Sequence, residues 1–301
     1  MKHITVVANK RWEADALVGV LASREARPSY LRSPQLVNQP PDTTDNLYAP
    51  IDSPRALIMV SDSDGNQSCE VSVWCIEDMM LPDSHKSSTE KKWPILKNQI
   101  MSVTRDLVVA FGTAAHPDHR SHNGCVVLGN NIFIYNPYPN GENKDSKWNH
   151  AKTEQLVRSG ASDKFFDKIT PQLRVEIEKR FINPPNNPAT DLLVLHSQEL
   201  LSVGVVNITD YSDYAWADHR TIERARAANI TDPIGSMETT HGIIRLASDS
   251  PFLFISGIAD RVGFFDVEVN PRTYAQNFTA AHNAGVALAW LIPVLTDALQ
   301  K

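Results

Sequence analysis

The stretch Phe252-Leu253-Phe254-Ile255-Ser256-Gly257-Ile258-Ala259-Asp260 joins an unbroken apolar run to small residues and a carboxylate. Four consecutive large apolar side chains predict a strand that is buried on both faces, as in the parallel part of an α/β sheet. We expect this strand to cover residues 251–256, so that Asp260 lies just beyond its end. Ligands of open α/β sheets bind at the carboxyl ends of the strands. The stretch therefore predicts both the fold class and the edge of the sheet that carries the site.

Similar apolar runs recur along the chain and alternate with segments of helical periodicity. This alternation predicts an α/β layer fold with a mixed sheet. The runs at 56–60 and 70–76 are expected to pair as a hairpin. Further strands are expected at 3–8, 107–111, 125–135, 192–196 and 203–208, and helices at 12–23, 93–103, 163–180, 221–228, 239–247 and 273–299.

The length of 301 residues suits a single α/β domain that spans 1–301. Residues 27–53 are rich in Pro, Asn and Asp and show no periodicity, so we expect a loop insertion there. The formal net charge of -6 argues against a nucleic-acid partner, which needs clustered Lys and Arg. The basic pair Lys91-Lys92 is expected to be a solvated surface.

Features of the chain also bear on its compartment. The N-terminal segment lacks the apolar region of a signal peptide. The apolar segment 284–295 has about 12 residues, which is too short to span a bilayer, so no membrane association is expected. The cysteines Cys69, Cys75 and Cys125 are few and odd in number, which indicates no disulfide framework and a reducing compartment. The sequence thus predicts a cytoplasmic protein.

Two carboxylates at the ends of neighbouring elements are the strongest functional signal. Glu238 follows Met237 at the start of the helix predicted at 239–247, and Asp260 follows the apolar strand. Such carboxylates can face one crevice and suit a polyhydroxylated substrate, because one can accept hydrogen bonds from hydroxyls while the other handles a proton. The alternatives are a helix N-terminal charge for Glu238 and a solvated turn residue for Asp260.

Three further segments carry candidate functional residues. Gly112-Thr113-Ala114-Ala115 ends the strand predicted at 107–111, where freed amides can bind oxygens, or it is an ordinary tight turn. Glu13 comes soon after the first strand and is either functional or a solvated residue of a helical turn. His116, His119 and His122 share one loop with Pro117, which argues against a metal site.

Taken together, Gly112–Ala115, Ser236-Met237-Glu238 and Ser256–Asp260 resemble motifs of the nucleoside phosphorylase/nucleosidase superfamily, which cleaves the N-glycosidic bond of nucleosides. The resemblance implies a three-layer α/β/α fold with a central mixed β-sheet. It also implies roles for individual residues: Glu13 as the catalytic base and Asp260 as the catalytic acid, Glu238 and Met237 at the ribose, Gly112 and Thr113 at the nucleophile, and Tyr211 and Asp210 at the nucleobase.

The same resemblance distinguishes hydrolysis from phosphorolysis. The Gly-Asp-Pro opening of the phosphorolytic branch is absent, and Ser256 stands where the family has Arg. Ala259 stands where the family has Ser. We therefore expect hydrolysis of a nucleoside, in particular a purine ribonucleoside, without a cofactor and in a homo-oligomer. A phosphate-dependent phosphorylase and a non-catalytic nucleoside-binding or storage protein remain the alternatives.

Overall fold

The structure is a computed structural model that describes residues 1–38, 50–61, 66–80, 89–117, 122–135, 154–157, 164–184, 192–194, 212–228, 234–262, 264 and 274–299. Its strands are β1 (Lys2–Ala8), β2 (Gln35–Leu36), β3 (Ala56–Ser61), β4 (Gln67–Cys75), β5 (Leu107–His116), β6 (Val126–Gly129), β7 (Ile132–Tyr135), β8 (Glu154–Val157), β9 (Leu192–Val194) and β10 (Phe252–Arg261). Its helices are α1 (Arg11–Ala22), η1 (Ile76–Met79), α2 (Thr89–Ile95), η3 (Leu96–Ile100), α3 (Lys164–Asp167), α4 (Pro171–Glu178), α5 (Ser212–Ala227), α6 (His241–Ala247) and α7 (Tyr274–Leu299).

In the described residues, a mixed sheet runs in the order β2-β3-β4-β1-β5-β10-β6-β9. Its centre is parallel, because β1 pairs with β4 and β5, and β5 pairs with β10. The pairs β3–β4 and β10–β6 are antiparallel. The predicted hairpin of β3 and β4 is thereby confirmed. A separate antiparallel pair, β7 and β8, lies beside the sheet.

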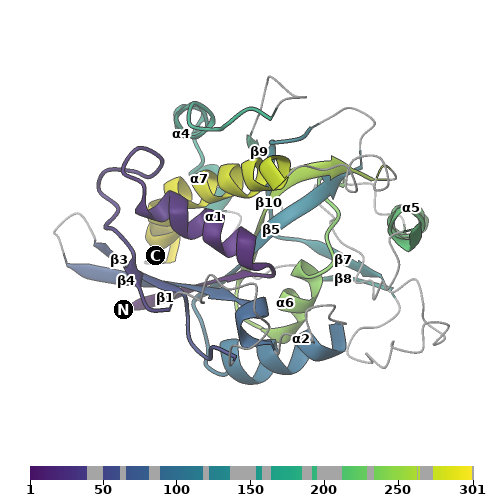
Figure 1. Cartoon of the computed structure of the whole chain (residues 1–301), viewed down its shortest axis with the longest axis horizontal. Helices are drawn as coiled ribbons and strands as arrows, with labels where there is room; N and C mark the ends of the chain where they lie inside the picture. The colour runs from purple at the N-terminus through teal and green to yellow at the C-terminus, as the bar shows by residue number, and fades with distance from the viewer. Residues whose placement is uncertain are drawn as a thin grey trace.

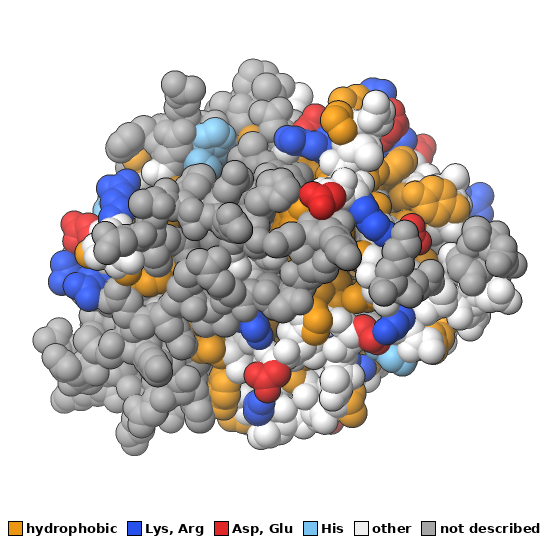
Figure 2. All heavy atoms as spheres, turned by 180° about the vertical axis from the view of Figure 1, so that it is seen from behind, with side chains coloured by type: hydrophobic (Ala, Val, Ile, Leu, Met, Phe, Trp, Pro, Cys, Tyr) orange, Lys and Arg blue, Asp and Glu red, His pale blue; other side chains and the backbone are white. Residues whose placement is uncertain are grey.

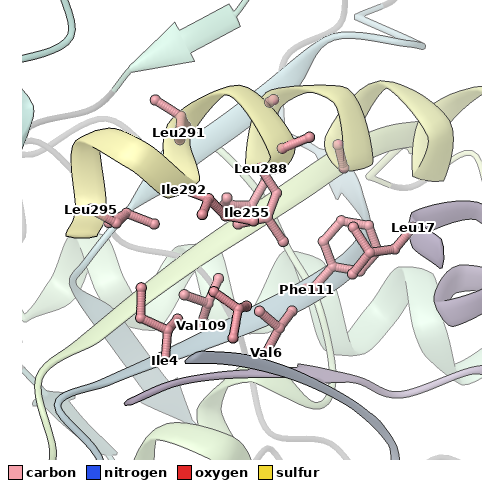
Figure 3. Packing of buried hydrophobic residues seen from close by; sticks show 14 of the residues in the cluster. Ile4, Val6, Leu17, Val109, Phe111, Ile255, Leu288, Leu291, Ile292 and Leu295 are labelled. Atoms are coloured by element: carbon pink, nitrogen blue, oxygen red, sulfur yellow. The ribbon is translucent and has the colours of Figure 1, made fainter. Parts of the chain in front are cut away.

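Helices cover both faces of this sheet, so the predicted three-layer architecture is confirmed. Figure 1 shows α1 and α7 on one side of the strands, and α2 and α6 on the other. Each face has its own apolar core. On the α7 side, Leu288 and Ile292 pack over strand residues that include Val109 and Ile255 (Figure 3). The strands are buried on both faces, which explains why their sequences are continuous apolar runs.

The last helix, predicted at 273–299, is observed as α7 over Tyr274–Leu299. The apolar segment is part of α7, and Ala275–Leu299 is long and apolar enough to cross a bilayer by length and composition alone, with a mean hydropathy of 1.4. In this fold 72% of that window is buried inside the protein. Gly257 of β10 permits this packing, since a Cβ there would lie 2.0 Å from the carbonyl oxygen of Ala280. Helix α7 is thus a buried core helix that packs on one face of the sheet.

Other elements also depart from their expected bounds. Strand β5 continues through Gly112–Ala115, so the predicted turn at these residues is wrong, and β10 extends past Ser256 to Arg261. The helix predicted at 163–180 is divided into α3 and α4 around Thr170, whose side chain caps α4. Part of the expected 27–53 insertion forms β2 at the sheet edge. The strand predicted at 203–208 lies outside the described residues.

Candidate active site at the carboxyl ends of β1, β5 and β10

The predicted site residues converge where the central parallel strands end. Met237 forms an antiparallel bridge with Ala115 near the end of β5, in which each backbone N–H donates to the other residue's carbonyl at 2.7 and 2.9 Å. On the other side of β5, Asp260 of β10 pairs in register with the same Ala115. This arrangement brings Glu238, which precedes α6, and Asp260 of β10 to the two sides of one strand end.

Glu13 joins them from the first turn of α1, directly after β1. Its side chain is only 4% exposed, so the alternative of a solvated helical turn is wrong. Oε1 accepts hydrogen bonds from the amide and the hydroxyl of Thr113, at 2.8 and 3.0 Å. Oε2 accepts from the amide of Lys10 at 2.9 Å, which also satisfies a free amide at the helix start. Gly112 leaves room for this carboxylate, because a Cβ there would lie 3.0 Å from Oε1.

Burial and charge adjust the acidity of Glu13. Desolvation, with a contribution from the negative charge of Glu238, raises its pKa from 4.5 to about 7. The hydrogen bonds from Lys10 and Thr113 oppose this rise because they stabilise the carboxylate. A carboxyl group with a pKa near neutrality is suited to exchange protons with a bound reactant at physiological pH.

The Met237-Glu238 segment is fixed by backbone contacts on both sides. Beyond the bridge to Ala115, Oε2 of Glu238 accepts from the amides of Thr240 and His241, at 2.5 Å each. Glu238 therefore binds the free amides at the start of α6, which is the helix N-terminal role given above as the alternative. It also lies beside the other candidate residues. The ring of His241 is buried, with Nδ1 4.0 Å from Oε2 of Glu238, and burial lowers the pKa of His241.

Asp260 occupies an irregular position near the end of β10. The register with β5 shifts between Ile258 and Asp260, so Ala259 is the extra residue of a bulge. Bulges re-aim the following side chain and are frequent beside active sites. Asp260 is 7% exposed and belongs to the strand, so the alternative of a solvated turn residue is wrong. Ser256 lies further back in β10, with its hydroxyl 3.4 Å from Nδ1 of His241.

A network of buried and half-buried ion pairs supports the start of α1. The ammonium of Lys10 lies 2.7 Å from Glu77, and the guanidinium of Arg11 lies 3.1 Å from Asp78. Buried Arg55 pairs with Asp78 as well and reaches Asp15. Asp15 is thereby committed to an ion pair at the surface. These contacts hold the helical turn that carries Glu13.

Lys92 is a buried cation beside the candidate site that the sequence did not predict. The pair Lys91-Lys92 was expected to be solvated, yet only Lys91 is exposed, whereas Lys92 is 7% exposed and its ammonium donates to Oγ1 of Thr240 at 3.0 Å. The signal was present in the helical spacing. Lys92 shares one face with the buried residues Ile95 and Leu96, three and four positions later.

Not every predicted site residue can be placed. Asp210 and Tyr211, predicted at the nucleobase, lie outside the described residues, as does His119. The rings of His116 and His122 lie in contact, with centroids 4.1 Å apart and their planes tilted by 45°. On the face shown in Figure 2, the described basic and acidic side chains lie in small separate groups, with no continuous basic surface among them.

The chain is similar to known proteins in its three-dimensional structure. The chain matches no protein-family model and no curated protein sequence. Its structure is similar to that of 5'-methylthioadenosine nucleosidase from Arabidopsis thaliana, with a TM-score of 0.53 and 14% identity over 98% of this chain and 96% of that one. Futalosine hydrolase from Helicobacter pylori gives a TM-score of 0.51 and 9% identity over 97% of both chains.

A third solved structure extends the same likeness. The 5'-methylthioadenosine/S-adenosylhomocysteine nucleosidase from Neisseria meningitidis, in complex with methylthio-immucillin-A, gives a TM-score of 0.50 and 12% identity over 97% of this chain and 99% of that one. These likenesses cover nearly the whole chain. They show that it has the three-layer fold of these nucleosidases, which the sequence motifs predicted.

Proposed function

We propose that this protein hydrolyses the N-glycosidic bond of a purine ribonucleoside. The observation that carries the proposal is the buried carboxylate of Glu13, held by Thr113 beside the Met237-Glu238 segment and Asp260. These residues are far apart in the sequence and lie in separate segments of the chain. Their convergence at the carboxyl ends of parallel strands, in a fold shared with nucleosidases, supports a common reaction.

The contacts of Glu13 favour water over phosphate as the nucleophile. The amide and hydroxyl of Thr113 are the donors that would otherwise receive an anion at this strand end, and both donate to Glu13. A phosphate would have to displace a carboxylate or lie against its negative charge. A water molecule, in contrast, can donate a hydrogen bond to that carboxylate. This argument supports hydrolysis.

In the proposed reaction, each carboxyl group has one task. Glu13 accepts a proton from water as the water oxygen bonds to C1′ of the sugar. Asp260 donates a proton to the purine as the bond between C1′ and the base nitrogen breaks. Glu238 accepts hydrogen bonds from ribose hydroxyls, and Met237 packs against the sugar. General acid and general base catalysis of this kind each contribute about 10²- to 10⁴-fold.

A nucleoside panel tests the proposal. The protein is incubated with purine and pyrimidine nucleosides, with and without inorganic phosphate, and free base and sugar are separated by chromatography. We expect free base and free ribose, or its 5′-modified form, at a rate independent of phosphate. Ribose 1-phosphate formed in proportion to added phosphate would establish a phosphorylase instead. Binding without any base release would favour a non-catalytic nucleoside-binding protein.

Two substitutions test the assigned roles. Asp260→Asn should lower turnover at least about tenfold, because an amide cannot deliver the proton. Glu238→Gln should weaken ribonucleosides more than 2′-deoxyribonucleosides, since a carboxylate accepts stronger hydrogen bonds from hydroxyls than an amide does. Unchanged turnover for the first variant, or equal losses for the second, would remove that residue from its role.

We also propose a homo-oligomer that works in the cytoplasm. The described cysteines Cys69, Cys75 and Cys125 are free and buried, which suits a reducing compartment. Light scattering coupled to size-exclusion chromatography measures the mass of the assembly. A mass of about 33.5 kDa, that of one chain, would contradict the oligomer.

A further inference from the structure

Lys92 of α2 is a buried cation beside the Met237-Glu238 segment. Its ammonium has three N–H groups, and one of them donates to Oγ1 of Thr240. The amide of Thr240 donates in turn to Glu238. Thr240 therefore links the ammonium of Lys92 to the carboxylate that is assigned to ribose. Glu238, Glu77 and Glu13 all act on Lys92 electrostatically, yet none of these described carboxylates lies within 4.0 Å of its nitrogen.

This arrangement is costly without a further ligand. A buried ammonium is normally paired and fully hydrogen-bonded, because burial removes its hydration. Among the described residues, Thr240 is the hydrogen-bond acceptor of Lys92, and two N–H groups therefore remain for another group. The nearby cation Lys10 is already paired with Glu77 at 2.7 Å. Lys92 is thus a cation beside Glu238 whose remaining N–H groups can donate hydrogen bonds to a ligand.

The charges around Lys92 indicate which group it binds. An anionic ligand would approach the carboxylates of Glu238 and Glu13, and their repulsion opposes it. A hydroxyl is suited to the gap between an ammonium and a carboxylate, because its oxygen accepts from one while its proton goes to the other. Sugar hydroxyls are therefore the chemical class that matches this pair.

We propose that Lys92 is a substrate-binding residue that donates a hydrogen bond to the oxygen of a ribose hydroxyl whose proton goes to Glu238. The inference rests on the proposed function, since it assigns Glu238 to the sugar. Lys92 and Glu238 then select together for a ribonucleoside with a free hydroxyl at that position. A deoxynucleoside lacking this hydroxyl leaves the buried ammonium without its acceptor and binds more weakly.

The proposal makes the selectivity depend on pH. Desolvation, with a contribution from Lys10, lowers the pKa of Lys92 from 10.5 to about 8, while the carboxylates oppose this change. Above this pH the neutral amine is a weaker donor, so discrimination against the deoxynucleoside should decrease. The charged groups that face Lys92 come from several elements: Glu77 from η1, Glu238 from the segment before α6, and Lys10 and Glu13 from the start of α1, while Lys97 of η3 is bonded to the carbonyl of Ala247.

Binding of three probes tests the proposal. Adenosine, 2′-deoxyadenosine and 3′-deoxyadenosine are mixed rapidly with the protein, and dissociation constants are measured by tryptophan fluorescence at pH 7 and pH 9. Lys92→Met should weaken adenosine about tenfold at pH 7 and should weaken one of the two deoxynucleosides much less. Lys91→Met, at the exposed neighbour, is the matched control and should bind as the wild type does.

The outcomes separate this proposal from the proposed function. Equal weakening of all three probes by Lys92→Met, or no weakening, would overturn it. Should Lys92→Met fail to fold, the wild-type protein still decides, because its discrimination between adenosine and the deoxynucleoside must decrease from pH 7 to pH 9, and an unchanged ratio refutes the proposal. Selective binding that depends on Lys92 without base release would support the inference and contradict the hydrolase. Base release together with a Lys92→Met variant that discriminates as the wild type does would support the hydrolase and contradict the inference.

Discussion

Replacing Glu13 with Gln should remove a pH dependence of stability that comes from the buried carboxyl group. Its pKa is raised from 4.5 to about 7 on folding. Each unit of pKa difference corresponds to about 1.4 kcal/mol, so the total effect is about 3 kcal/mol. Below pH 4.5 the group is protonated in both states, and its contribution to the stability of the native state is fully present. As the pH rises through 7 this contribution is lost, because the unfolded state ionises more easily.

Urea denaturation of both proteins between pH 4.5 and pH 8.5 measures this effect. The free energy of unfolding of the wild type, relative to that of Glu13→Gln, should fall by about 3 kcal/mol across this range. The exposed Glu25 is the matched control, and Glu25→Gln should run nearly parallel to the wild type. A constant difference between the wild type and Glu13→Gln would refute the buried, near-neutral carboxyl group. A difference that rises with pH would refute the sign of the argument.

Four other substitutions follow from the contacts of individual residues. Gly112→Ala places a Cβ 3.0 Å from Oε1 of Glu13 and should lower turnover about tenfold or more by displacing the carboxylate, whereas Gly19→Ala, with nothing within 4 Å, should stabilise the protein by about 0.5–1 kcal/mol in thermal melts. Thr113→Val removes a donor to the Glu13 carboxylate, so its pKa should rise by about one unit or less, and the acid limb of the pH–rate profile should move upward. An unmoved limb would show that the hydroxyl does not stabilise the charged form. Gly257→Ala should destabilise the fold by about 3 kcal/mol in urea, since its Cβ would meet a backbone carbonyl of α7; a loss of less than about 1 kcal/mol would contradict this packing.

The linear sequence was sufficient for the architecture and for most of the candidate site. The apolar runs of the central strands are long because both faces of the sheet are covered, so they were recognisable without any tertiary information. Glu13 follows the first strand within a few residues, Glu238 lies at the start of a helical pattern, and Asp260 lies near the end of an apolar strand. Such local relations are visible in a sequence. The selection of these three as candidate residues needed only the motifs and the rule that ligands bind at the carboxyl ends of strands.

The tertiary structure decided the environment of these residues. Whether Gly112–Ala115 forms a turn or a strand depends on pairing with β10 and with Met237, which is distant in sequence, so a local pattern could not settle it. Burial of Glu13 and Lys92 likewise depends on elements that fold over them, and burial is what moves their pKa values towards neutrality. The sequence by itself therefore determined which carboxylates were present at the sheet edge, whereas only the packing determined their protonation and their partners, because both depend on the loss of solvent.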